Sequence, residues 1–146
     1  MSKILGLAMI AGVGMITFAQ PAAAQSATQA CTAGPWMVFF DFDQDAISPS
    51  AAAILDNAAS AYQACGQGQV MISGHTDRKG TDQYNVGLSQ RMAANVRAYL
   101  SGRGIPDAVM TTEAFGESRP LVDTKDGVSE PQNRRVEITF GPGSGW

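Results

Sequence analysis

Asp77 is the residue whose type and position best suit ligand binding. It ends the motif GHTD at residues 74–77, which follows a short apolar run at residues 70–72. A carboxylate at the end of a buried strand can bind an ammonium group through charge-assisted hydrogen bonds, each worth about 1.5–3 kcal/mol when shielded from water. The alternative is structural: Asp77 caps the turn toward Gly80 or pairs with Arg78. On the residues alone, both roles remain open.

Three further polar residues have either a ligand-binding or a structural role. Asn85 stands in the first turn of a predicted helix, where it can orient a ligand or cap its own helix. Asp41 and Asp43 follow another apolar run; they either add negative potential to a site or hydrogen-bond the backbone at a strand end. Because ligand sites in α/β sheets form at the carboxyl ends of strands, we expect Asp77 and Asn85 to meet at such an edge.

A hydrolase that uses Asp77 with His75 is the enzymatic alternative. The two residues are near neighbours at a predicted strand end, where successive side chains diverge. No nucleophile with an adjacent base and no oxyanion motif accompanies them. One histidine and two cysteines do not make a zinc site. We therefore expect no enzyme, no metal and no cofactor, and a structural hydrogen bond for His75.

A strand and a helix must position Asp77 and Asn85. The apolar run before the GHTD motif predicts a buried strand. After a polar turn, apolar residues recur at Leu88, Met92, Val96 and Tyr99 or Leu100, which is the spacing of one helix face. Thr81 or Asp82 can cap this helix, and the glycines at 102 and 104 with Pro106 end it.

Three more strands and a helix complete the predicted order. Residues 36–40 form an apolar run of strand length, continued by an alternation that places Phe40 and Phe42 on one face, which we expect to be the core face, and the two acids on the other. Ser48 as N-cap and Pro49 in the first turn start a helix that ends at Gly66. Residues 109–116 predict a third strand, residues 121–132 a loop, and residues 135–140 a fourth strand.

The order β-α-β-α-β-β predicts an α/β (α+β) domain. Two crossover helices favour parallel neighbouring strands with right-handed connections. We expect both helices on one face of a small mixed sheet, which gives a two-layer sandwich.

The N-terminal residues predict export. Lys3 precedes an uncharged apolar run of about 15 residues, which is shorter than the about 20 needed for a membrane span. An Ala-x-Ala site then predicts a signal peptide at residues 1–24, cut after Ala24. An uncleaved anchor is one alternative. A lipoprotein attached at Cys31 is another, but Thr28 does not suit such a site. We expect a mature N-terminal segment at 25–35, the domain at 36–140 and a frayed tail at 141–146.

The charge of the chain limits the classes of partner, and its cysteine content predicts a disulfide. Asp and Glu number 13 against 10 Lys and Arg, and no basic run occurs, so nucleic acid is not an expected partner. Export and an even cysteine count predict a disulfide between Cys31 and Cys65. Closing that loop of about 35 residues would stabilise the fold by about 3–4 kcal/mol in the chain-entropy model. Two unpaired, buried thiols are the alternative.

Three sequence blocks carry a resemblance to a known family. Residues 74–91 read G-H-T-D-x-x-G-x-x-x-Y-N-x-x-L-S-x-R, residues 133–138 read N-R-R-V-E-I, and residues 39–43 read F-F-D-F-D. In this order and spacing they resemble the OmpA-like peptidoglycan-binding domains, which include the peptidoglycan-associated lipoproteins and a domain of flagellar stators. The resemblance covers about residues 36–140 and implies the same two-layer fold.

The resemblance implies non-covalent peptidoglycan binding in the periplasm or at the outer membrane, tethering the envelope to the cell wall. The residue matching Asp77 holds the ammonium of diaminopimelate in the stem peptide, so Asp77→Asn should remove binding and keep the fold. Arg134 matches an arginine at the pocket edge; its alternative is a salt bridge to Asp123 or Glu130. The implied ligand-binding set is Asp77, Asn85, Arg134, Asp41, Asp43, Thr76, Leu88, Arg91 and Met92.

Met92 departs from the family pattern. Fifteen residues after the motif aspartate, the family has an arginine that binds the ligand carboxylate. Here Arg91 comes one residue early, which rotates its side chain by about 100° around a helix. A lost arginine–carboxylate pair costs about 2–3 kcal/mol, so Met92→Arg should tighten binding unless Met92 is buried. This departure supports the alternative function, an envelope protein–protein interaction domain of the same fold with weakened cell-wall binding.

Overall fold

A four-stranded mixed sheet with two α-helices forms the domain. The computed structural model describes residues 14, 34–65 and 68–141. The predicted order β-α-β-α-β-β is confirmed, with two short 3₁₀ helices, η2 and η3, added before the third and fourth strands. The elements are β1 (Trp36–Phe39), α1 (Pro49–Ala64), β2 (Val70–His75), α2 (Asp82–Gly102), η2 (Asp107–Val109), β3 (Met110–Ala114), η3 (Pro131–Asn133) and β4 (Arg135–Phe140).

The strand order is β1-β4-β2-β3. β2 and β3, which α2 connects, are parallel neighbours as predicted. The prediction is wrong for the first crossover, because β4 lies between β1 and β2 and is antiparallel to both. The last strand of the chain therefore inserts at the centre of the sheet, and it brings Arg134 beside the end of β2.

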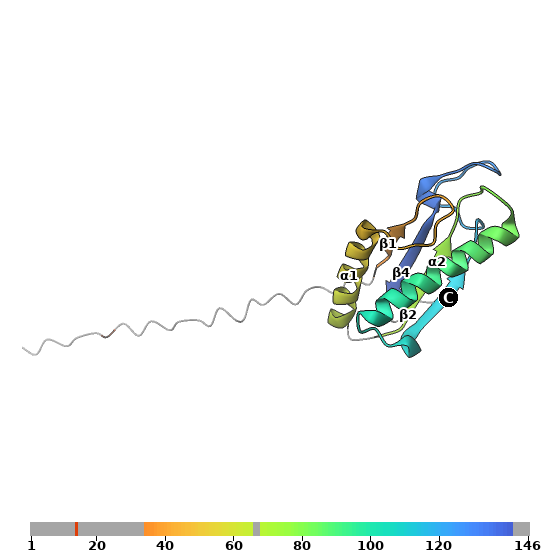
Figure 1. The fold of residues 1–146 in the computed structure, drawn as a ribbon. Helices are drawn as coiled ribbons and strands as arrows, with labels where there is room; N and C mark the ends of the chain where they lie inside the picture. Colours follow the sequence, from red (N-terminus) through yellow and green to blue (C-terminus); the bar gives the residue numbers. More distant parts are fainter. Residues whose placement is uncertain (1–13, 15–33, 66–67, 142–146) are drawn as a thin grey trace, which may run out of the picture.

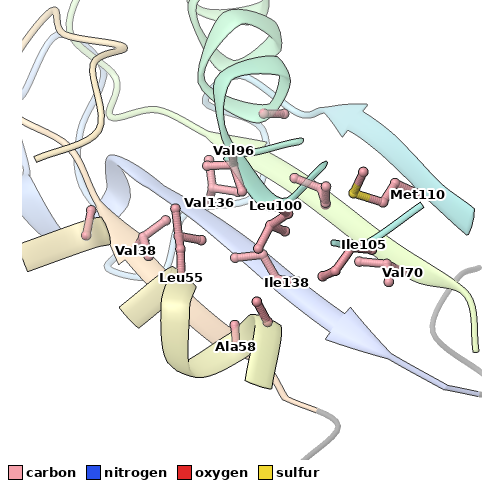
Figure 2. Packing of buried hydrophobic residues seen from close by; sticks show 14 of the residues in the cluster. Val38, Leu55, Ala58, Val70, Val96, Leu100, Ile105, Met110, Val136 and Ile138 are labelled. Carbon is pink, nitrogen blue, oxygen red and sulfur yellow. The ribbon is translucent and has the colours of Figure 1, made fainter. Parts of the chain in front are cut away.

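Both helices pack on one face of the sheet, as expected for a two-layer sandwich (Figure 1). Val38 of β1 pairs with Val136 of β4, and Val136 pairs with Gly74 of β2, so all three face the same side. One buried cluster joins these strands to Leu55 of α1 and Val96 of α2 (Figure 2). This core fixes the C-terminal end of β2 and the first turns of α2, where the candidate site lies.

Helix α2 begins and ends where the sequence predicts. Thr81 is its N-cap, and its hydroxyl accepts a hydrogen bond from the Tyr84 N–H at 3.2 Å. Leu88, Met92, Val96 and Leu100 are buried, which confirms the predicted apolar face. Ser48 likewise caps α1, with Pro49 in the first turn.

The first strand is shorter than predicted. A turn closed by the Gln44 N–H and the Asp41 carbonyl follows it, and Asp43 adopts a positive φ of 54°. The predicted alternation therefore fails after Phe40: Phe40 is buried, but Phe42 is 52% exposed. The third strand is also shorter, since η2 occupies its expected first residue.

Several predictions concern residues that the structure does not describe. Apart from residue 14, these include the signal peptide at 1–24, most of the segment 25–35, and residues 142–146 of the tail. Cys65, the C-cap of α1, is disulfide-bonded. Cys31 lies outside the described residues, so the pairing of the two cysteines stays a prediction.

Candidate functional site

Asp77 lies immediately beyond β2 and is almost fully buried, at 3% exposure. One carboxylate oxygen accepts a hydrogen bond from the Lys79 N–H at 3.2 Å. The other accepts from the Ser129 hydroxyl at 3.1 Å, the Glu130 N–H at 3.2 Å and Nη1 of Arg134 at 2.9 Å. The predicted cap of the local turn is therefore present, but the ion-pair partner is Arg134 and not Arg78.

Arg134 is held between two strands, and it forms a buried ion pair with Asp77. Its side chain is 11% exposed, and that of Asp77 is 4% exposed. Its Nε donates to the Phe40 carbonyl at 3.1 Å, which ties the end of β1 to the start of β4. The alternative salt bridges to Asp123 or Glu130 do not form. Contact with Asp77 instead places Arg134 inside the site.

Asn85 is buried in the first turn of α2. Its amide nitrogen donates to the Asp77 carbonyl at 3.2 Å, the Lys79 carbonyl at 3.1 Å and Glu117 Oε2 at 2.8 Å. Asn85 thus holds the loop between β2 and α2, while Thr81 caps the helix. Burial and the neighbouring Asp82 carboxylate raise the pKa of Glu117 above its ordinary value, and its bond with Asn85 opposes that rise.

These elements enclose a pocket of about 270 Å³, here called the Asp77 pocket. Its lining residues are Phe42, Asp43, Asp77, Lys79, Gly80, Tyr84, Asn85, Leu88 and Arg134. Phe42 and Tyr84 are about half exposed, so the apolar wall is open at the rim. The pocket offers carboxylates for a cation, Arg134 and Lys79 for an anion, and apolar surface for a carbon chain, which suits a ligand carrying both charges.

The structure brings together five of the nine predicted ligand-binding residues in this pocket: Asp77, Asn85, Arg134, Asp43 and Leu88. The other four lie elsewhere. Thr76 is buried and donates its hydroxyl to the Asp77 carbonyl at 3.0 Å. Arg91 points to Asp45, at 3.1 Å.

Met92 and Asp41 also lie outside the Asp77 pocket. Met92 is 1% exposed and belongs to the core cluster, because its position continues the apolar face of α2. Asp41 lines a second, larger hollow of about 450 Å³ on another side of Arg134, together with Phe39 and Pro131. We place the candidate site in the smaller pocket because it contains Asp77 and Asn85, whereas the larger one holds neither.

His75 has an environment separate from that of Asp77. Its ring stacks on Phe115 at 5.2 Å between centroids and lies 3.8 Å from Glu137. Burial, together with the positive charge of Arg135, lowers the pKa of His75 from 6.5 to about 4. The structural hydrogen bond expected for His75 is absent among the described residues, since neither ring nitrogen has a partner. Nothing in this arrangement joins His75 to Asp77 as a catalytic pair.

Sequence reasoning missed several residues of the site. Ser129 and Glu130, which donate hydrogen bonds to Asp77, belong to residues 121–132, for which the sequence predicts a loop and no role in the site. Tyr84 precedes Asn85 in the Y-N step of the quoted motif, so that motif contained a signal for it. Phe42 was interpreted as a core residue. In the described part of the chain, no group of three or more His, Cys, Asp or Glu side chains could hold a metal ion.

Comparison with known proteins gives a consistent family. The model of the OmpA family matches residues 39–134. Outer membrane protein A of Bordetella avium is 39% identical over 100 residues, which are 68% of this chain and 52% of that protein. The peptidoglycan-associated lipoprotein of Haemophilus influenzae is 35% identical over 103 residues, which are 70% of this chain and 67% of that protein. The chain thus spans about half to two thirds of these relatives.

Solved structures agree with the fold. The peptidoglycan-associated lipoprotein of Burkholderia pseudomallei has a TM-score of 0.67 and 32% identity, covering 80% of this chain and 98% of that one. The cell wall anchor of the T6SS from Pseudomonas aeruginosa has a TM-score of 0.61 and 25% identity, covering 73% and 80%. Within the described residues, no helix is long and apolar enough to cross a membrane.

Proposed function

Because the chain belongs to the OmpA family, we propose that it binds peptidoglycan non-covalently through the diaminopimelate side chain of the stem peptide. The observation that carries the proposal is the Asp77 pocket, in which a buried carboxylate and a guanidinium meet at the end of β2. Diaminopimelate presents an ammonium and a carboxylate on one carbon chain, so it matches both charges and the apolar wall of this pocket.

The ligand ammonium would share Asp77 with Arg134. Both oxygens of Asp77 already accept hydrogen bonds from the protein. Arg134 uses Nε and Nη1 for its hydrogen bonds in the described part of the chain, so Nη2 is the nitrogen left for a ligand carboxylate. Arg134 would then take the role that the family gives to an arginine at the position of Met92.

The cellular role follows from the relatives. Proteins that carry this domain are named as outer membrane proteins, peptidoglycan-associated lipoproteins and a cell wall anchor. For this chain we propose export, removal of the signal peptide after Ala24, and a tether between the envelope and the cell wall. The tether is a binding function and needs neither a cofactor nor a catalytic residue.

A second candidate function is an interaction domain that contacts another envelope protein. Two observations favour it: Asp77 already accepts four hydrogen bonds from protein donors, and Met92 contributes no charge. This candidate predicts that the Asp77–Arg134 pair serves only to hold β2, β4 and the loop at Ser129 together.

Titration calorimetry with two peptides separates the candidates. The first is a stem peptide in which the side-chain amine of diaminopimelate is free. The second is the same peptide with that amine acetylated. If Asp77 binds the ammonium, acetylation should weaken binding by about tenfold or more, or about 1.4 kcal/mol. Added salt should weaken the binding of the first peptide, because salt screens the attraction between the ligand ammonium and the Asp77 carboxylate. Equal affinity for both peptides, or no binding of either, contradicts the proposal and favours the interaction domain.

A further inference from the structure

The loop between β1 and α1, residues 40–48, supplies part of the wall of the Asp77 pocket. Phe42 and Asp43 line the pocket from this loop, whereas the other lining residues come from the β2–α2 loop, α2 and Arg134. Phe42 is 52% exposed, so burial in the core does not fix its position. Something else must hold this part of the wall.

A row of side chains on α2 holds the loop. Tyr84 donates its hydroxyl to Asp43, Arg91 Nε donates to Asp45 Oδ2 at 3.1 Å, and Asn95 donates its amide to the Asp45 carbonyl at 2.9 Å. Tyr84, Arg91 and Asn95 are spaced by seven and four residues, so they lie along one face of the helix. The Arg91 guanidinium lies 6.0 Å from the centre of the Tyr84 ring, which links neighbouring members of the row.

The ion pair in this row is poorly suited to stabilising the fold. The side chains of Arg91 and Asp45 are 51% and 38% exposed. Exposed pairs contribute about 0–1 kcal/mol to stability because water and salt screen them. The same contact can nevertheless restrict an exposed loop to one position among several of similar energy.

We propose that Arg91 is a positioning residue: with Asp45 it holds the 40–48 loop against α2, so that Phe42 and Asp43 stand as a wall of the Asp77 pocket. This inference rests on the proposed function and assigns to Arg91 a role without ligand contact. It gives a physical reason for an arginine next to Met92. The helix directs Met92 into the core and Arg91 toward the loop.

The chain contains a matched control on the same helix. Arg97 pairs with the Asp107 carboxylate through Nε to Oδ1 at 2.7 Å and Nη2 to Oδ2 at 2.8 Å, and Nη2 also donates to the Asp107 carbonyl at 3.1 Å. Asp107 belongs to η2, and neither residue lines the Asp77 pocket. Arg97→Ala therefore removes an equal charge and a shorter ion pair from α2 without touching the 40–48 loop.

The test uses Arg91→Ala, Asp45→Ala and Arg97→Ala in the full chain. Calorimetry with the diaminopimelate stem peptide should show about three- to fivefold weaker binding for the first two variants, and no change for Arg97→Ala. Thermal unfolding should shift little in any of them. Arg91→Lys, which keeps the charge, should recover part of the lost affinity.

The two loop variants also separate positioning from simple electrostatics. Arg91→Ala makes the rim more negative and Asp45→Ala makes it more positive. An effect of charge alone would change the affinity in opposite directions, whereas loss of the contact weakens binding in both. Opposite signs would overturn the proposal.

Hydrogen exchange tests the loop without any ligand. Amides of residues 41–47 should exchange faster in Arg91→Ala and Asp45→Ala than in the parent and in Arg97→Ala. Unchanged exchange overturns the proposal, and so does faster exchange with unchanged affinity. If the parent does not bind the peptide, the proposed function and the positioning role both fail, while exchange still shows whether Arg91 holds the loop.

Discussion

The four hydrogen bonds that Asp77 accepts within the protein determine what a ligand must do to reach it. Three of them come from Ser129, Glu130 and Arg134, which follow Asp77 by more than fifty residues. A ligand ammonium must displace one of these donors or bind beside them. The net gain is then smaller than that of a free carboxylate, which predicts modest affinity.

Asp77→Asn should abolish binding and also weaken the fold, contrary to the expectation from sequence that the fold is unaffected. The variant leaves Arg134 buried without its counter-charge, and removing one partner of a buried pair costs about 3–5 kcal/mol. Urea unfolding and sacculus sedimentation measure the two effects. The double variant with Arg134→Gln should regain part of the stability but no binding. Wild-type binding by a folded Asp77→Asn protein would contradict the role of Asp77.

Met92→Arg should destabilise the domain without tightening binding. Met92 is 1% exposed within the core cluster, so an arginine there is a buried, unpaired charge that costs several kcal/mol, on the order of 3 or more. Met92→Leu, of similar volume, is the control and should change stability by less than about 1.5 kcal/mol. Circular dichroism on heating distinguishes them. A folded Met92→Arg protein with higher affinity would show that this side chain reaches the pocket.

At the scale of elements, the close approach of β2 to α2 decides where Asp77 and Asn85 stand. Gly74 makes this approach possible, because a Cβ at this position would overlap the Ser89 carbonyl oxygen and lie 2.9 Å from its carbon. The buried Ser89 hydroxyl donates to the Val86 carbonyl at 2.8 Å and accepts from the Gly116 N–H at 3.0 Å. The strand, the helix and the turn after β3 are thus fixed together beside the site.

Gly74→Ala should therefore destabilise the domain by about 3 kcal/mol, since neither backbone segment can move without disturbing the other. Gly102→Ala is the matched control, because a Cβ there meets nothing within 4 Å. Chemical denaturation of both variants is the measurement. Equal stability of Gly74→Ala and the parent would mean that α2 can shift away from β2 at low cost.

At the scale of the whole molecule, the single histidine makes stability depend on pH. The pKa of His75 is about 4 in the folded protein and near 6.5 when unfolded. Between these values the unfolded chain binds a proton that the folded protein excludes. The contribution of His75 to the free energy of unfolding is therefore complete above pH 6.5 and is lost as the pH falls to about 4, a change of about 3 kcal/mol.

The variant His75→Phe is the control for this dependence of stability on pH. It keeps a ring to stack on Phe115, removes the titrating group, and sacrifices no hydrogen bond within the described structure. Glu117 has a raised pKa and acts with the opposite sign, so the difference between parent and variant isolates His75. Denaturation between pH 7 and 4 should show a flatter profile for the variant. Identical profiles would mean that His75 titrates normally in the folded protein.

Export and the disulfide give another prediction for the whole molecule. The exported protein should begin at Gln25 and carry a Cys31–Cys65 bond. Mass spectrometry with and without reduction measures both properties. Two thiols that alkylate without reduction, or an N-terminus that retains the apolar run, would refute the corresponding part.

The sequence alone determined the helices and strands and pointed to the region of the candidate site. Helices and strands depend on interactions between residues that are near one another in the chain. Examples are the apolar face at Leu88 and Val96, the helix caps at Ser48 and Thr81, and the alternation at residues 136–140. Such interactions are visible as local patterns. The GHTD motif beside Asn85 located the site for the same reason, because one strand and the helix that follows it carry both residues.

The tertiary structure alone decided which side chains meet there. Insertion of β4 between β1 and β2 brings Arg134 to Asp77, and no local pattern encodes strand order. The turn at Asp43 moves Phe42 from the expected core to the pocket rim. The packing of the 40–48 loop against α2 brings Asp45 to Arg91, whereas the apolar face of the helix already indicated that Met92 is buried. Contacts between distant segments depend on how the whole core packs, so only the folded chain determines them.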